Sequence, residues 1–175
     1  SSYAYEIKTE LDTLNKLSKQ INDYAKVFEF VTVILHPKHL KSASELLPEY
    51  CGIELYDLSS GSCTFETYRE PSLSPLINKS VQVENLTTKD LDFILRFCGE
   101  KEIPSKRKAK EEKIFLNLQM DEINHYFKMA IKQRYRDRWI YLCKSFKKIN
   151  PIDIQELFIG PIEPSAIYYK NSSIV

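Results

Sequence analysis

Two short polar patterns near the start of the chain contain residue types that can bind a metal ion and position a water molecule. Glu6 and Lys8 are two residues apart in the run 3–8, so on a β-strand their side chains point to the same face. A carboxylate and an ammonium held together there can bind a hard metal ion and position a water molecule. Gln20 and Tyr24 are four residues apart, which places an amide and a phenol on one face of a helix.

The elements that must position these four residues alternate between strands and helices. Residues 3–8 alternate apolar and polar side chains, and residues 10–28 carry an apolar stripe of helical period. The pattern then predicts, in chain order, a buried strand at 30–35, a short helix at 38–47, a strand at 52–58, a turn at 59–62 and a hairpin strand at 63–68. This β-α-β-α-β order predicts an α/β fold with a partly parallel sheet and helices packed on it.

The second half of the chain is expected to be helical. A Pro- and Ser-rich stretch marks the joint, and the run Thr87-Thr88-Lys89-Asp90 offers an N-cap for the helix that follows it. A long helix is predicted from about residue 121 to 148, with apolar residues on one broad face. We therefore expect an α/β domain over 1–70, a linker over 71–87, an all-helical C-terminal domain over 88–160 and a tail over 161–175.

Glu6-x-Lys8 followed by Gln20-x-x-x-Tyr24 resembles the PD-(D/E)XK nuclease superfamily, in particular its RecB-like branch. Residues 5–58 are also similar to an uncharacterised bacterial and phage family assigned to that superfamily. The resemblance implies a partial PD-(D/E)XK mixed sheet flanked by helices. In it, Glu6 would bind Mg²⁺ or Mn²⁺, Lys8 would position the attacking water, and Gln20 and Tyr24 would face the active site.

The superfamily pattern also requires an Asp on the strand before Glu-x-Lys, and only five residues precede Glu6 here. The resemblance therefore implies that a partner chain or a missing N-terminal segment completes the sheet. Asp12 has two interpretations. It can cap the following helix, or it can lie near the metal and in part replace the missing Asp.

A basic segment between residues 128 and 148 is a second candidate site. Arg134, Arg136, Arg138 and Lys144 lie in it beside Tyr and Trp residues, which suits contact with the phosphate backbone of DNA. Alternatively, these residues form the solvated outer face of a helix. This alternative stays open because alternate arginines cannot all share one helix face that contacts DNA.

The bulk composition describes an ordinary globular protein, with 43% hydrophobic residues, 28% charged residues and a net charge of +1. Four cysteines without C-x-x-C spacing argue against a zinc site and indicate reduced, mostly buried thiols in a cytoplasmic protein. The three histidines form no cluster with acids, so we expect them to be structural or surface residues. No apolar run is long enough to span a membrane.

These observations together predict a nucleic-acid-processing protein, a Mg²⁺-dependent phosphodiesterase (DNA nuclease) or a fragment of one. One alternative is a non-catalytic DNA-binding or protein-assembly module that retains the nuclease scaffold. Another is a helical protein-binding adaptor, for which neutralising Arg134 and Arg138 would leave DNA affinity unchanged.

Overall fold

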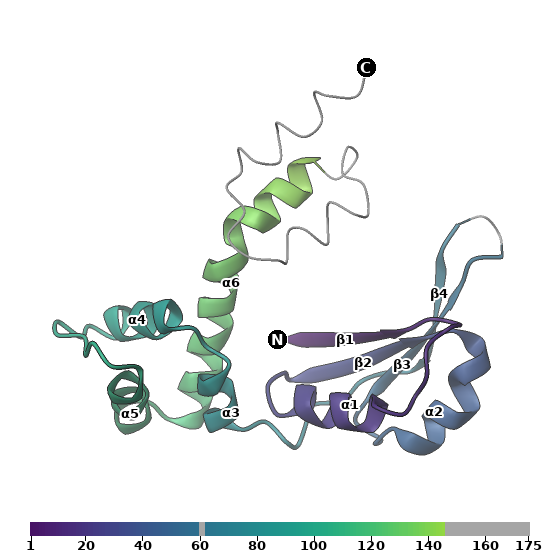
Figure 1. Ribbon diagram of the computed structural model, residues 1–175, viewed down its shortest axis with the longest axis horizontal. Helices are drawn as coiled ribbons and strands as arrows, with labels where there is room; N and C mark the ends of the chain where they lie inside the picture. Colours follow the sequence, from purple (N-terminus) through teal and green to yellow (C-terminus); the bar gives the residue numbers. More distant parts are fainter. Residues whose placement is uncertain (60–61, 146–175) are drawn as a thin grey trace. The chain divides into compact units, whose positions relative to one another are not determined.

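The computed structural model describes residues 1–59 and 62–145. The predictions for residues 146–175 lie outside the described residues. They are the end of the long helix, the end of the helical domain and the tail over 161–175. The elements, shown in Figure 1, are β1 (Tyr3–Lys8), α1 (Leu17–Ala25), β2 (Phe30–Leu35), the 3₁₀ turn η1 (Pro37–His39), α2 (Leu40–Leu46), β3 (Gly52–Asp57), β4 (Thr64–Arg69), α3 (Lys79–Glu84), α4 (Thr88–Phe97), α5 (Arg107–Asn117) and α6 (Met120–Ser145).

The four described strands form one mixed sheet in the order β1-β2-β3-β4. β1 pairs parallel with β2, and β2 pairs parallel with β3, while β3 and β4 form an antiparallel hairpin. This confirms the partly parallel sheet that the alternating strands and helices predicted. Whether the sheet is nuclease-like stays a prediction. β1 is an edge strand of this sheet, so one of its sides has no neighbour among the described strands.

One face of the sheet packs against α1 and α2, which lie on the same side of it in Figure 1. The core between them contains fully buried side chains from β2, from α1 and from α2, and these are Val31, Val33, Leu35, Leu17, Ile21, Ala25 and Ala43. Glu6 pairs with Val33 and Lys8 with Leu35 in the β1–β2 register. The two polar residues therefore point to the covered face, at its edge, where α1 lies above them.

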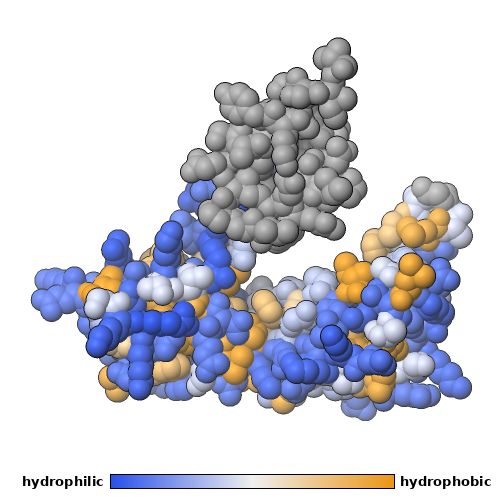
Figure 2. All heavy atoms as spheres, in the orientation of Figure 1, coloured by the Kyte–Doolittle hydropathy of each residue, from blue (hydrophilic) through white to orange (hydrophobic). Residues whose placement is uncertain are grey.

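The opposite face of β1 is solvent-exposed although its side chains are large and apolar. Tyr3, Tyr5 and Ile7 are 52%, 53% and 59% exposed, and the Tyr3 ring stacks on Phe30 of β2. Phe65 of β4 is also exposed, and Figure 2 shows apolar residues at the surface near the β3–β4 hairpin. Parallel sheets are usually covered on both faces, so this face is unusual.

The segment expected to be a linker, 71–87, instead packs on the α/β part. It contains α3, and Ser74 donates from its hydroxyl to the Ala25 carbonyl and from its backbone N–H to the Glu29 carbonyl. The Gln82 amide donates to the Val27 carbonyl. As a result, residues 1–130 form one compact unit, and the second unit begins at Ile131, within α6.

α1 is shorter than the predicted helix 10–28. The Asp12 carboxylate accepts from the backbone N–H and the hydroxyl of Thr9 at 2.7 and 2.6 Å. This local turn competes with helical hydrogen bonding, so residues 10–16 stay outside the helix. Leu11, expected in the apolar stripe, is 94% exposed as a consequence. Asp12 does not cap α1, because the N-cap residue is Lys16 and no side chain caps that helix end.

The helical part of the first unit follows the sequence prediction closely at α4. Thr87 and Asp90 form a reciprocal capping box at its start, and Gly99, with φ of 84°, follows its end. α6 follows the prediction only in its first half. Ile123, Phe127 and Ala130 are buried, but Trp139 is 66% exposed and Tyr135 is 39% exposed. None of the helices in the described ranges is long and apolar enough to cross a membrane.

Candidate active site

The four residues singled out from the sequence meet in one hydrogen-bonded cluster around the Glu6 carboxylate. Lys8 Nζ lies 2.7 Å from Glu6 Oε1, and the Gln20 amide donates to the same oxygen at 2.7 Å. The Tyr24 hydroxyl donates to Glu6 Oε2 at 3.0 Å. Lys8 also donates to the Gln20 carbonyl oxygen at 3.0 Å, which closes the network. We call these four residues the Glu6 cluster.

The Glu6 cluster forms because two periodicities coincide. Residues two apart on β1 point to the face that α1 covers, and residues four apart on α1 point down to that face. The buried residues Leu17, Ile21 and Ala25 anchor α1 over the sheet. The cluster is well shielded from water, since the Lys8 and Glu6 side chains are only 10% and 12% exposed.

Burial and charge both act on the phenol of the cluster. Removal of Tyr24 from water raises the pKa of its hydroxyl, and the hydrogen bond to the Glu6 carboxylate raises it further. Tyr24 therefore stays protonated and acts as a hydrogen-bond donor over the whole physiological pH range. In this arrangement the carboxylate receives three donors, and two of them, the amide and the phenol, are neutral.

The Glu6 cluster alone does not fit a divalent metal. Mg²⁺ prefers six oxygen ligands and is usually held by one or two carboxylates with several waters. Glu6 supplies one carboxylate, whose oxygens already accept from Lys8, Gln20 and Tyr24. Within residues 1–59 and 62–145, no group of three or more His, Cys, Asp or Glu side chains is placed to hold an ion.

Asp12 does not replace the Asp that the superfamily pattern requires. Its carboxylate is exposed and bound to Thr9, and these hydrogen bonds lower its pKa. The three histidines have structural contacts, as expected. His36 accepts from the Lys38 N–H and packs edge-on against Tyr56, while His39 Nε2 lies 3.0 Å from the Thr9 carbonyl. His125 packs against Tyr126.

The basic residues of α6 are spread around the helix. Arg134 and Arg138 are one turn apart and both guanidinium groups lie near the Tyr135 ring, at 5.8 and 6.0 Å from its centroid. Arg136 is exposed on another side, and Lys144 is exposed near the end of the described helix. Contact of these residues with nucleic acid stays a prediction.

The cysteines differ from the expectation of mostly buried thiols. All four are free, but only Cys51 is buried, and Cys63, Cys98 and Cys143 are exposed. Burial raises the pKa of the Cys51 thiol to about 11, so it is an unreactive core residue.

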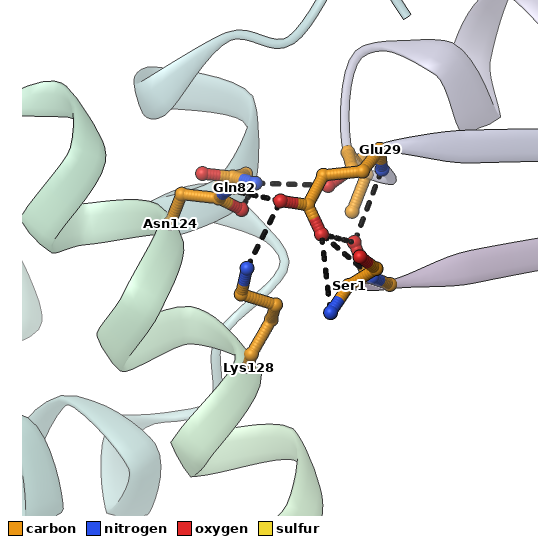
Figure 3. Close-up of polar contacts among 7 residues, drawn as sticks. Ser1, Glu29, Gln82, Asn124 and Lys128 are labelled. Carbon is orange, nitrogen blue, oxygen red and sulfur yellow. Dashed lines mark hydrogen bonds and ion pairs between the residues drawn. The ribbon is translucent and has the colours of Figure 1, made fainter. Parts of the chain in front are cut away.

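A second polar cluster, which the sequence did not reveal, surrounds Glu29 at the start of β2 (Figure 3). Glu29 Oε2 accepts from the backbone N–H of Ser2 at 2.6 Å and from its hydroxyl at 3.2 Å. Glu29 Oε1 accepts from Asn124 and Lys128 of α6 at 3.1 and 3.0 Å. Asn124 in turn accepts from the buried Gln82 amide at 2.9 Å.

Opposing effects set the charge state of Glu29. Burial alone would raise the pKa of its carboxyl group. Hydrogen bonds from Lys128, Ser2 and Asn124, together with the Lys128 charge, outweigh burial and lower the pKa to about 2. Glu29 is therefore a fixed anion that joins β1, β2 and α6, and its donors leave no open position for a ligand. We interpret it as structural.

Comparison with known proteins gives one family. The model of the family described as bacteriophage P4 protein cII matches residues 1–158. Protein cII of Enterobacteria phage P4 is 24% identical over 135 residues, which are 77% of this chain and 51% of that protein. The chain thus spans about half the length of this curated relative. No solved structure matches the chain.

Proposed function

This chain belongs to the bacteriophage P4 protein cII family, and we propose that it contributes the Glu-x-Lys half of a nucleic-acid phosphodiesterase site. The observation that carries the proposal is the Glu6 cluster. A strand supplies a carboxylate and an ammonium, and the following helix supplies an amide and a phenol, all within hydrogen-bond distance. This is the grouping that the resemblance to PD-(D/E)XK nucleases implies, and its nuclease character is part of the proposal.

The proposal requires a second carboxylate from outside the described residues. β1 has one side without a neighbouring strand, and an added strand there would lie next to Glu6 and Lys8. Such a strand could belong to a longer form of the protein or to a partner chain. With that carboxylate in place, Mg²⁺ or Mn²⁺ would stabilise charge on the scissile phosphate.

The residues of this chain would have separate tasks in such a site. Lys8 carries three N–H donors, so a water or phosphate oxygen could accept from it in place of Glu6 or Gln20. Gln20 and Tyr24 donate hydrogen bonds without adding charge. They would therefore hold Glu6 in place while Lys8 exchanges Glu6 for a water or phosphate oxygen. Because the cluster is shielded from water, these interactions are stronger than they would be at the surface.

A nuclease assay with Mn²⁺ on single- and double-stranded DNA tests the proposal. It compares this chain, a form extended at the N-terminus (here the full protein) and a Lys8→Ala variant of the full protein. Lys19→Ala is the matched control, because Lys19 is an exposed lysine of α1 that lies outside the Glu6 cluster. We expect the full protein and its Lys19→Ala variant to cut DNA, and Lys8→Ala to lose at least about 100-fold in rate. Cutting that survives Lys8→Ala would refute the assignment.

A second function, that of a non-catalytic binding module, is favoured by the saturation of Glu6. The Glu6 carboxylate already accepts from Lys8, Gln20 and Tyr24, and one carboxylate does not form a metal site. On this interpretation the Glu6 cluster only fixes α1 to the sheet. The full protein would then shift DNA in a gel without cutting it, and Lys8→Ala would change stability but not DNA affinity.

A further inference from the structure

Helix α4 has an open pocket on the side away from its buried residues. The pocket has a volume of about 560 Å³, and its lining residues recur at helical spacing on one face, namely Lys89, Asp92, Phe93, Arg96 and Phe97. We propose that this pocket binds single-stranded nucleic acid, with bases stacked on the aromatic rings and backbone phosphates held by Lys89 and Arg96. The proposal does not depend on the phosphodiesterase proposal, because it involves neither the Glu6 cluster nor a metal.

The aromatic side chains form a continuous row at the surface. The Phe93 and Phe97 ring centroids are 6.0 Å apart, and Phe97 meets Tyr126 of α6 edge-on at 5.8 Å. His125 continues the row at 5.4 Å from Tyr126. Phe97 is 57% exposed, which is unusual for a Phe whose helix has a well-packed apolar side. Exposed aromatic rings of this kind are the platforms on which unpaired bases stack.

The charges of the pocket suit an anionic ligand. Lys89 and Arg96 are exposed, and among the residues that the structure describes neither forms an ion pair with a carboxylate. Asp92 is the only acidic residue of the lining, and it forms an ion pair with the buried Lys110 of α5. The pocket is therefore positive at neutral pH, although it carries an acidic residue.

The two ends of the aromatic row differ in charge. Glu122 and Glu100 act on the groups around Cys98 and Tyr126, and Glu100 is bound by Lys113 and Asn117. In the pocket lining itself the carboxylate is that of Asp92, and Lys110 neutralises it. We therefore place the bases along Phe93 and Phe97 and the phosphates beside Lys89 and Arg96, which lie in the first and the last turn of α4.

The row of rings favours a single strand over a duplex. In a duplex the base faces are stacked on each other and cannot reach a protein ring, whereas a single strand presents them. Stacking tolerates any base, so the site should show little sequence preference. DNA and RNA share this chemistry, and a separate arm of the experiment distinguishes them.

Fluorescence anisotropy tests the proposal with the full chain in EDTA, so that no cutting interferes. The probes are labelled oligothymidylate and oligouridylate of about 12 nucleotides, and a DNA duplex of the same length. We expect both single strands to bind more tightly than the duplex, and a preference between them would identify DNA or RNA as the better ligand. Phe97→Ala should weaken binding about tenfold, while Phe97→Trp should preserve it.

The cations are tested by the salt dependence of the affinity. Arg96→Ala and Lys89→Ala should each weaken binding and reduce the slope of log K against log salt by about 0.7. Two substitutions serve as matched controls. Phe65→Ala removes a ring of similar exposure on β4, and Lys41→Ala removes an exposed cation on α2. Neither should change the affinity.

Each remaining outcome overturns the proposal. If the wild-type chain does not bind either single strand, the pocket is not a nucleic-acid site. If it binds but Phe97→Ala binds equally well, with its circular dichroism unchanged, then other residues, such as the arginines of α6, carry the binding. A Phe97→Ala variant that keeps full DNA affinity but loses a protein partner would assign the pocket to protein recognition instead.

Discussion

Lys128 Nζ lies 3.0 Å from Oε1 of Glu29, and this ion pair joins the start of β2 to α6 across 99 residues of sequence. The other oxygen of Glu29 holds Ser2 at the start of β1. One carboxylate therefore links the edge of the sheet to the helical part of the first compact unit. The α/β and helical parts of residues 1–130 should unfold together rather than in two steps.

Glu29→Ala should lower the free energy of unfolding by about 2–4 kcal/mol, because it leaves Lys128, Asn124 and Ser2 without their shared acceptor. Urea denaturation followed by circular dichroism measures the loss. Asp23→Ala is the control, since it removes a carboxylate from an exposed pair with Lys19 and should leave the free energy of unfolding nearly unchanged. Equal losses in the two variants would contradict a structural role for Glu29.

Stability should also fall in acid because of Glu29. Its pKa is about 2 in the folded protein, against an ordinary value of 4.5. Folding therefore stabilises the charged form of the carboxylate. A lowered folded-state pKa stabilises the protein above about pH 4.5, and the stabilisation is lost as the pH falls from there to about 2. The contribution is about 2–3 kcal/mol once solvent screening is allowed for.

Glu29→Gln isolates this contribution, since the amide does not titrate. Between pH 5 and pH 2.5, the free energy of unfolding of the wild-type chain should fall more steeply than that of the variant (both limits are approximate and follow from the pKa values). Parallel curves for the two proteins would show that Glu29 is not the group responsible.

The Glu6 cluster could be predicted from the sequence because its geometry follows from local periodicity. A spacing of two on a strand and a spacing of four on a helix fix which side chains share a face. The β-α-β order then brings the two faces together, and the structure indeed places Gln20 and Tyr24 on Glu6. What the cluster does chemically is not contained in these spacings.

The Glu29 cluster could not be predicted in this way, because its members have no local pattern. Asn124 and Lys128 come from a helix 95 and 99 residues away, and a glutamate beside a strand is an ordinary surface residue in sequence. The same applies to the domain division. The Pro- and Ser-rich composition of 71–87 indicates a linker, whereas hydrogen bonds from Ser74 and Gln82 attach it to the α/β part.

Gly52 should not tolerate a side chain. A Cβ atom there would lie 2.7 Å from the hydroxyl of the buried Thr32 and 2.9 Å from the Pro71 ring. Gly52→Ala should therefore cost about 1–3 kcal/mol, measured as a shift in the urea midpoint. Thr32→Ala in the same chain should recover part of that loss, because it removes the closest clash.

Gly99→Ala should also lower stability, but through backbone conformation and not through a steric clash. Space is open around Gly99, but its φ of 84° is costly for any residue with a Cβ. We expect a loss of about 1 kcal/mol that Thr32→Ala does not relieve. If Thr32→Ala also restored the stability of the Gly99→Ala variant, then Thr32→Ala would act through something other than relief of the clash at Gly52.

The hydrogen bond between Tyr24 and Glu6 should be visible in the titration of the phenol. Burial and the Glu6 carboxylate both raise the Tyr24 pKa above its ordinary value of 10.0. Glu6→Gln removes only the second cause, so the pKa should fall but stay above 10.0. Carbon-13 NMR of ring-labelled tyrosine measures it. Tyr50 is the internal control, because burial raises its pKa without any contribution from Glu6. A Tyr24 signal that titrates identically in both proteins would show that the phenol does not donate to Glu6 in solution.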